Sequence, residues 1–173
     1  MLYNKLTMQV NIALLTVTDT RSIDTDKSGA ILIKKIAEQN HKLVDRKICK
    51  DEKTEIKKII LNWTKDINID VIITTGGTGL TGRDITPETL DEIADKKITG
   101  FGELFRQLSY STIGTSTLQS RACAILKNGK YIFALPGSSG GVTDAWDMIL
   151  KHQLDINHKP CNFVELLPRL KEK

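Results

Sequence analysis

Aromatic residues and long apolar runs are both scarce in this sequence. Only 5% of its 173 residues are aromatic, so the core must be built mainly from Ile, Leu and Val. No apolar stretch approaches the roughly 18–20 residues that a membrane-spanning helix needs. The N-terminal segment MLYNKLTMQVN contains neither the apolar segment nor the small-residue cleavage site of a secretion signal. We therefore expect a cytoplasmic globular protein, and neither a membrane, a secreted nor a disordered one.

Cysteine is scarce as well. The three cysteines, Cys49, Cys123 and Cys161, are scattered and form no Cys-x-x-Cys pair. No histidine cluster accompanies them, so the sequence predicts neither a zinc site nor a disulfide framework. We expect three reduced thiols, as is usual in the cytoplasm.

An excess of one sign of charge is also missing. The sequence has 25 basic and 21 acidic side chains, for a formal net charge of +4. Its lysine doublets are isolated, and neither zinc-finger spacing nor an RNA-binding aromatic signature accompanies them. This balance argues against a nucleic-acid partner and allows only weak attraction for a small anionic ligand.

What the sequence does contain is an alternation of buried strands and amphipathic helices. Apolar runs predict strands over residues 10–17, 42–49 and 71–75. Helical spacing of apolar residues predicts helices over residues 27–40 and 53–66, between those strands. This succession predicts an α/β fold with a parallel sheet, right-handed crossovers and helices on both faces.

The second half of the sequence predicts shorter elements. They are a helix from Pro87, a helix over residues 101–110, strands over residues 122–126 and 131–135, and a helix over residues 142–154. Asn128-Gly129 marks a hairpin between the two strands. The length suits one domain, which we expect over residues 8–155, followed by a C-terminal tail over residues 156–173.

Ligands of such sheets bind beyond the carboxyl ends of the strands. That rule selects three loops, over residues 18–28, 76–86 and 136–141. All three are rich in Gly, Ser, Thr and Asp, although loops commonly are.

The loop after the third predicted strand is the most informative, with the sequence TTGGTGLTGRD over residues 74–84. Its glycines let backbone N–H groups approach a ligand and form an anion-binding concavity. It lacks the Lys-Ser/Thr pair of a P-loop and the distal acidic residue of a dinucleotide-binding fingerprint. A phosphate-binding loop of another kind is therefore the interpretation, with a plain flexible turn as the alternative.

Two carboxylates accompany these loops. Asp84 follows the glycines, and Asp51 lies at the end of the second predicted strand. Carboxylates beside a phosphate-binding loop are suitable Mg²⁺ ligands, and two of them could hold one metal that neutralises phosphate charge. Each could instead be the N-cap of the helix that follows it.

Further polar groups lie in the other two loops. The segment from Pro136 through Gly137 and Ser138 opens the last helix, and is either an anion site or a well-capped helix start. Ser28 and Gly29 could offer hydrogen-bond donors to a ligand. Three arginines are candidate phosphate partners or ordinary ion-pair residues: Arg83, Arg106 and Arg121.

Together these segments resemble the MoaB/Mog molybdopterin-binding family, from about residue 10 to residue 154. The matching segments are Asp19 with Arg21, Asp26-Lys27-Ser28-Gly29, Thr75–Gly79 followed by Asp84, Thr86-Pro87-Glu88, Gly100-Phe101-Gly102-Glu103 and Leu135-Pro136-Gly137. Two more, GTSTLQSR over residues 114–121 and KPCNF over residues 159–163, are similar to the bacterial MoaB branch of that family.

The resemblance implies a three-layer α/β/α sandwich that binds molybdopterin, a pterin with a dithiolene and a terminal phosphate. Active relatives use ATP as co-substrate and Mg²⁺ to adenylate that phosphate, with release of pyrophosphate and no tightly bound cofactor. The important acidic positions of the family fall on Asp51 and Asp84, which would act in catalysis by positioning Mg²⁺ and the attacking phosphate. The alternatives are a non-catalytic molybdopterin-binding protein and a generic nucleotide-binding domain.

The resemblance also implies the remaining site residues and an assembly. Thr75, Gly76, Gly77, Thr78 and Gly79 would contact the pterin or its phosphate, and Ser28, Gly29, Pro136, Gly137 and Ser138 would surround the nucleotide or the pterin. Relatives are trimers or hexamers, so we expect a homo-oligomer. The tail over residues 156–173 could pack on a neighbouring subunit of it.

Overall fold

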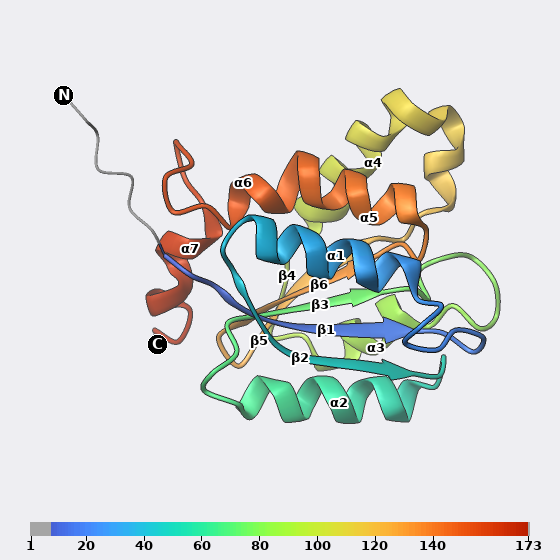
Figure 1. The fold of residues 1–173 in the computed structure, drawn as a ribbon, viewed down its shortest axis with the longest axis horizontal. Coiled ribbons are helices and arrows are strands. Elements are labelled where there is room, and N and C mark those ends of the chain that lie inside the picture. Colours follow the sequence, from blue (N-terminus) through green and yellow to red (C-terminus); the bar gives the residue numbers. More distant parts are fainter. Residues whose placement is uncertain (1–7, 173) are drawn as a thin grey trace.

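The computed structural model describes residues 8–172; residues 1–7, where the absence of a secretion signal was expected, and Lys173 lie outside the described residues. A six-stranded sheet with the order β2-β1-β3-β6-β5-β4 forms its centre (Figure 1). The strands are β1 (Asn11–Val17), β2 (Lys42–Cys49), β3 (Val71–Thr75), β4 (Lys96–Lys97), β5 (Cys123–Lys127) and β6 (Lys130–Leu135). Strands β1, β2, β3 and β6 are parallel, whereas β5 and β4 are added antiparallel at one edge.

Helices cover both faces of this sheet. The helical elements are α1 (Lys27–Glu38), α2 (Lys53–Lys65), α3 (Thr86–Ile93), α4 (Thr99–Ile113), the 3₁₀ helix η1 (Gly114–Gln119), α5 (Ser139–Ala145), the π-helical η2 (Trp146–Leu150), α6 (Lys151–Gln153), α7 (Phe163–Leu166) and the 3₁₀ helix η3 (Leu167–Arg169). In Figure 1, α2 and α3 lie on one side of the sheet, and α1, α4, α5 and α6 lie on the other. The predicted α/β fold with a mostly parallel sheet is therefore confirmed. Within residues 8–172, no helix combines the length and apolar character that crossing a membrane requires.

Strand β1 shows why this sheet is buried on both sides. Ile12 and Leu14 pack in the core beneath α1 and α5, whereas Ala13, Leu15 and Val17 pack in the second core above α2. Successive side chains of a strand point to opposite faces, so an uninterrupted apolar run fills two cores at once. Strand β1 is thus held between β2 and β3 and between two cores, so the loop at its end is well placed.

Three elements differ from the sequence prediction. Helix α4 continues past Tyr110 to Ile113 and is followed directly by η1, where no helix was predicted. Strand β4 consists of two exposed lysines, so no apolar pattern marked it. The last helix begins at Ser139 instead of residue 142 and runs as α5, η2 and α6 to Gln153.

The C-terminal tail packs on the body of its own chain. The ring of Phe163 lies 4.6 Å from that of Tyr131 and 5.8 Å from that of Phe133, centroid to centroid. The Tyr131 hydroxyl donates a hydrogen bond to the carbonyl of Phe163 (3.2 Å), and Asn162 caps α7 through the N–H of Glu165. A contact of this tail with a neighbouring subunit stays a prediction.

Candidate functional site

The carboxyl ends of the parallel strands bring four loops to one edge of the sheet. Val17 pairs with Cys49, Thr16 with Thr75, and Thr75 with Leu135, so β2, β1, β3 and β6 end side by side. The loops after these strands include the three that the sequence selected. Residues that are far apart in the sequence therefore lie close together at this edge of the sheet.

The glycine loop after β3 has a backbone that only glycine allows at two positions. Gly76 and Gly77 have φ angles of 102° and 64°. A Cβ on Gly76 would lie 2.1 Å from the carbonyl oxygen of Val17, and one on Gly77 would lie 2.4 Å from Oγ1 of Thr86 and 3.0 Å from Oδ1 of Asp51. The absent side chains thus allow β1, Asp51 and α3 to approach the loop closely.

Arg121, which is distant from this loop in the sequence, holds the loop in place through hydrogen bonds. Its Nε donates to the carbonyl of Gly79 (2.6 Å), one Nη donates to the carbonyl of Asp84 (2.6 Å), and the other pairs with Glu88. The N–H of Arg121 also donates to the carbonyl of Thr78 (3.0 Å). The planar guanidinium is suited to hold several acceptors in fixed directions. Arg121 is therefore engaged in positioning the loop, and not available as a free phosphate ligand.

The carboxylate of Asp84 is held inside this loop. It accepts hydrogen bonds from the N–H (2.9 Å) and the hydroxyl (2.5 Å) of Thr81. Burial acts to raise the pKa of Asp84, but the hydrogen bonds from Thr81 and Gly79 and the charge of Arg121 outweigh it, so the pKa is lowered. Asp84 is thus a fixed, ionised carboxylate.

Asp51 has a different environment. Its side chain is buried, and burial together with the charges of Asp19 and Asp84 raises the pKa of Asp51, against the lowering effect of Arg83. Asp19 itself has a lowered pKa, chiefly because Arg83 donates hydrogen bonds to it. A buried carboxylate that faces two others is electrostatically unfavourable, and a cation would relieve it.

Neither carboxylate acts as the helix cap that was the alternative in each case. The N-cap position of α2 is Glu52 and that of α3 is Ile85, and neither of these helices has a side-chain cap. The capping alternative for Asp51 and Asp84 is therefore wrong. At both places one residue separates the aspartate from the first residue of the helix, so each carboxylate lies in the loop.

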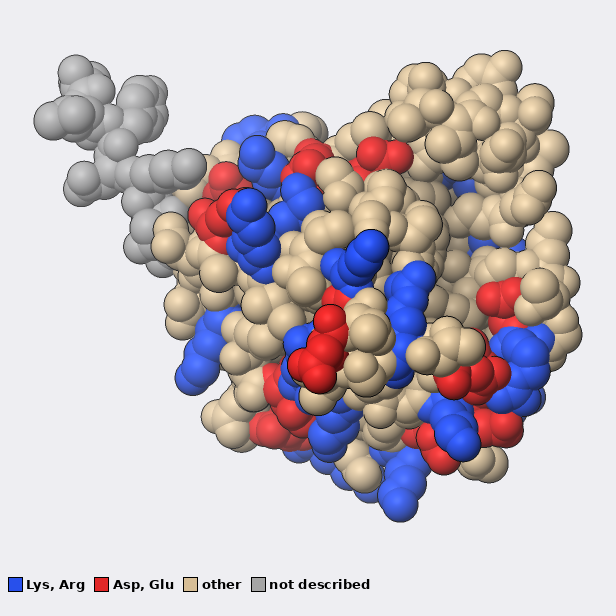
Figure 2. Space-filling view, turned by 45° about the vertical axis from the view of Figure 1, so that its right-hand side comes forward, with Lys and Arg blue, Asp and Glu red and all other residues tan. Residues whose placement is uncertain are grey.

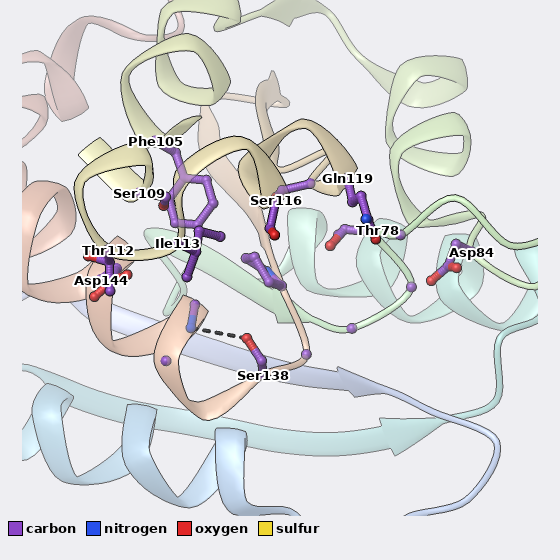
Figure 3. Close-up of a pocket in the computed structure, with 18 residues that line it drawn as sticks. Thr78, Asp84, Phe105, Ser109, Thr112, Ile113, Ser116, Gln119, Ser138 and Asp144 are labelled. Atoms are coloured by element: carbon purple, nitrogen blue, oxygen red, sulfur yellow. Dashed lines mark hydrogen bonds between the residues drawn. The ribbon is translucent and has the colours of Figure 1, made fainter. Parts of the chain in front are cut away.

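The larger of two adjacent cavities at this edge has a volume of about 580 Å³ and is mostly uncharged. It lies between the glycine loop, the α4–η1 segment and the start of α5 (Figure 3). Figure 3 shows Phe105 and Ile113 of α4 on one side of it and Ser138 on the other. Its lining is Gly76, Gly77, Thr78, Gly79, Asp84, Phe105, Ser109, Thr112, Ile113, Ser116, Gln119, Ser120, Pro136, Gly137, Ser138, Gly140, Gly141 and Asp144.

The smaller cavity has a volume of about 400 Å³ and is lined by charged groups. Its lining is Thr16, Val17, Thr18, Asp19, Thr20, Arg21, Asp51, Thr75, Gly76, Gly77, Arg83, Asp84, Gly137 and Ser138. It shares five of these residues with the larger cavity, and together they form what we call the common wall: Gly76, Gly77, Asp84, Gly137 and Ser138. Two ligands in the two cavities would therefore meet at the common wall.

Most of the predicted site residues line one or both cavities. Thr75 and Asp51 line the smaller cavity, and Thr78, Gly79 and Pro136 line the larger one. Ser138, on the common wall, also caps α5 by accepting a hydrogen bond from the N–H of Gly141 (3.1 Å), as the dashed line in Figure 3 marks. Both interpretations of that loop are thus compatible with the structure.

Ser28 and Gly29 line neither cavity. The Ser28 hydroxyl and the Gly29 N–H both donate to the carboxylate of buried Asp26, at 3.0 and 2.9 Å. The hydroxyl of Thr16 (2.6 Å) and the guanidinium of Arg46 (3.1 Å) donate to that carboxylate as well. Burial acts to raise the pKa of Asp26, but these four hydrogen bonds outweigh it and lower the pKa. The role of Ser28 and Gly29 toward a ligand stays a prediction, and their observed role is to fix the start of α1.

The other candidate residues from the sequence have varied surroundings. Arg106 donates to the carbonyl of Ala122 (3.5 Å) and lies outside both cavities, whereas Arg83 lines the smaller one. The three cysteines are free thiols. Burial raises the pKa of both Cys49 and Cys123 to about 12, which makes either one a poor nucleophile.

Sequence reasoning missed the α4–η1 side of the larger cavity. Phe105, Ser109, Thr112, Ile113 and Gln119 come from a helix and a 3₁₀ turn that extend over the sheet edge. The rule of strand ends cannot find residues on such an extension. The available signal was the GTSTLQS run after α4, which is polar, uncharged and followed by Arg121.

Comparison with known proteins gives matches over most of the chain. A family model described as "probable molybdopterin binding domain" matches residues 13–156. Molybdenum cofactor biosynthesis protein B of Escherichia coli (strain K12) is 44% identical over 152 residues, which cover 88% of this chain and 89% of that protein. The protein of the same name from Staphylococcus aureus (strain MRSA252) is 45% identical over 154 residues, covering 87% and 91%.

Solved structures are similar as well. A crystal structure of molybdenum cofactor biosynthesis protein B has a TM-score of 0.88 at 36% identity, covering 98% of this chain and all (100%) of that one. The tungsten cofactor synthesizing protein MoaB from Pyrococcus furiosus has a TM-score of 0.79 at 31% identity, covering 96% of this chain and 100% of that one.

Proposed function

The chain belongs to the family of probable molybdopterin binding domains, and on that premise we propose that it binds molybdopterin and adenylates its terminal phosphate with ATP. Molybdopterin would occupy the larger cavity, whose mostly uncharged lining suits a flat pterin ring. The phosphates of ATP would occupy the smaller cavity, whose lining carries the charged side chains. The protein would thereby serve molybdenum cofactor biosynthesis.

The observation that carries this proposal is the common wall. A phosphate at the end of molybdopterin and the α-phosphate of ATP must come into contact for adenylation. Gly76, Gly77, Asp84, Gly137 and Ser138 face both cavities, so ligands placed in the two cavities approach each other there. Proximity and orientation of two bound reactants supply a large part of the catalysis of such transfers.

The carboxylates of Asp51 and Asp84 are hard oxygen donors, which Mg²⁺ prefers. Asp51 is buried, faces other carboxylates and has a raised pKa, so a divalent cation beside it would be stabilising. Among residues 8–172, no group of three or more His, Cys, Asp or Glu side chains is arranged to hold a metal ion. Two protein carboxylates would therefore be completed by phosphate oxygens and water, and bound Mg²⁺ would supply charge neutralisation at the phosphates.

The chain's own groups would orient the transfer. A phosphate oxygen of molybdopterin forms the new bond to the α-phosphorus of ATP, while the bond from that phosphorus to pyrophosphate breaks. The close approach at Gly77 keeps Asp51 against the loop, and Arg121 fixes the carbonyls of Gly79 and Asp84. The protein's contribution is thus rigid placement and control of charge, and no covalent intermediate with a side chain is needed.

The decisive experiment combines purified protein with molybdopterin, ATP and Mg²⁺, and measures adenylated pterin and pyrophosphate. We expect both products in equal amounts, and their loss in the Asp51→Asn and Asp84→Asn variants. Asp91→Asn is the matched control, because Asp91 makes an exposed ion pair with Lys97 outside both cavities. Binding of molybdopterin without any product would overturn adenylation and leave a non-catalytic molybdopterin-binding protein.

We also propose that the protein is a cytoplasmic homo-oligomer, a trimer or a hexamer. The resemblance to the MoaB branch supports this assembly, and the three free cysteines support the location. Light scattering of the purified protein measures the mass directly. A monomer at micromolar concentration would contradict the oligomer.

A further inference from the structure

The smaller cavity contains more negative than positive side chains. Its lining includes the carboxylates of Asp19, Asp51 and Asp84, but only the guanidiniums of Arg21 and Arg83. A polyphosphate in this cavity would therefore face three carboxylates and only two guanidiniums. A side-chain cation redirected toward the phosphates would therefore favour binding, in addition to any metal ion.

The two arginines differ in what already engages them. Arg21 donates from Nη1 to the carbonyl of Gly137 (3.0 Å) and to the hydroxyl of Ser28 (3.3 Å). It thus ties the β1–α1 segment to the β6–α5 loop and holds the cavity together. Its partners are neutral groups that belong to the framework.

Arg83 instead directs its guanidinium at two carboxylates. Nε and Nη2 donate to the two oxygens of Asp19 at 2.9 and 3.0 Å, and Nη2 also donates to Glu52 at 3.0 Å. The side chains are 55% exposed for Arg83, 37% for Asp19 and 50% for Glu52. Ion pairs this exposed contribute little to stability, so they exchange readily for another anion. The paired donors that hold a carboxylate also fit two oxygens of a phosphate.

We propose that Arg83 exchanges Asp19 for the terminal phosphates of the nucleotide, so that it binds the pyrophosphate part of ATP. Asp19 is then the carboxylate that occupies this guanidinium when no nucleotide is bound. Its removal makes Arg83 more available, and the removal of Arg83 takes away a ligand of the departing pyrophosphate. This inference rests on the proposed function, because it assigns the terminal phosphates of ATP to the smaller cavity.

The test measures equilibrium binding by calorimetry for ATP, inorganic pyrophosphate and AMP, with and without Mg²⁺. The proteins are the wild type, Arg83→Gln, Asp19→Asn and the double variant. We expect Arg83→Gln to weaken ATP and pyrophosphate by about tenfold or more, the effect of losing a charge-assisted hydrogen bond, and to leave AMP nearly unchanged. Asp19→Asn should strengthen ATP and pyrophosphate binding in the absence of Mg²⁺, and the double variant should lose that gain.

The control variant is Arg169→Gln, because Arg169 is an exposed arginine that pairs with Glu172 in the C-terminal segment. It should bind all three ligands as the wild type does, and equal melting temperatures would show that all variants are folded. Unchanged ATP binding in Arg83→Gln, or an equal loss for AMP, would overturn the exchange while the proposed function stands. A wild-type protein that binds neither ATP nor pyrophosphate would overturn the proposed function together with this inference.

Discussion

The two cavities share a wall but are built by different means. The larger one is closed by the α4–η1 segment and has an uncharged lining apart from Asp84 and Asp144, whereas the smaller one lies among strand-end loops with five charged side chains. On the face shown in Figure 2, the lobe at the upper right, where α4 and η1 lie, is mostly uncharged, and acidic and basic side chains gather below it. The larger cavity is thus suited to select a ligand by shape, and the smaller one by charge.

The two linings thus separate the selection of ligands from the transfer chemistry within one small domain. Substitutions confined to one cavity should alter the binding of one ligand, and substitutions at the common wall or its supports should alter the transfer between the two ligands or the binding of both. The following predictions test that division, beginning with the largest expected effect.

Asp84→Asn should impair the transfer between the two cavities more than the binding in either one, because Asp84 lines both. We expect formation of adenylated pterin to fall by about 100-fold or more, the usual effect of removing one charge-stabilising group from a transfer site. Single-turnover assays under saturating ligands measure this step. Because the amide keeps the size of the carboxylate, molybdopterin should still bind within a few-fold of the wild type, and a variant with the wild-type rate would contradict the assignment.

Arg121→Ala should weaken both ligands, since the loop it holds belongs to both cavities. Loss of its hydrogen bonds to the carbonyls of Gly79 and Asp84 should lower kcat/KM by about 30-fold, or about 2 kcal/mol. Arg121→Lys keeps the charge without the planar donor set, so it should recover only part of the activity. Arg106→Ala is the control, because Arg106 makes one long hydrogen bond outside both cavities. An effect on one ligand alone would show that the loop is not a shared element.

Asp26→Asn should destabilise the fold as a whole, through a network that reaches the smaller cavity only at Thr16. The variant loses part of a buried network around Thr16, Ser28, Gly29 and Arg46, which should cost about 2 kcal/mol in the free energy of unfolding near neutral pH. Because the folded pKa of Asp26 is lowered, its contribution is present above the pKa of the unfolded chain and is lost as pH falls through the folded pKa. The difference in urea midpoint between wild type and variant should therefore shrink toward acidic pH. A difference that stays constant with pH would contradict the charged role of Asp26.

Ile113→Ala should have the smallest effect and the most selective one. Ile113 lines the larger cavity and is 50% exposed, so truncation removes apolar contact without opening the core. We expect molybdopterin affinity to fall about fivefold, or about 1 kcal/mol, and ATP affinity to stay unchanged. Ile67→Ala, at an 89% exposed position outside both cavities, is the matched control. Equal weakening of ATP would show that the two cavities are not independent.

Much of the sheet and of the smaller cavity could be predicted from the sequence. Apolar runs located β1, β2 and β3, and the rule of strand ends then placed Asp51 and the glycine loop together. These inferences depend on local patterns and on the geometry of parallel sheets, which vary little between proteins. The family resemblance named the ligand class, which no pattern of strands and helices could indicate.

The larger cavity could not be predicted in the same way. The position of Phe105 and Ile113 depends on how far α4 extends and how η1 turns back, which is a matter of tertiary packing. Ser28 and Gly29 lie in a segment of the expected loop composition, yet the Ser28 hydroxyl and the Gly29 N–H donate their hydrogen bonds to Asp26. A loop sequence shows which polar groups are present, but their partners are determined only when distant residues such as Thr16 and Arg46 come close.

The edges of the sheet restrict how the chain can associate with others. Edge strand β4 contains only Lys96 and Lys97, both exposed, and the opposite edge strand β2 carries charged residues along its middle. Charged and very short edge strands resist pairing with a strand of another molecule. Any association between copies of this chain should therefore use helix and loop surfaces, and a fibre formed by continuation of the sheet from chain to chain is disfavoured.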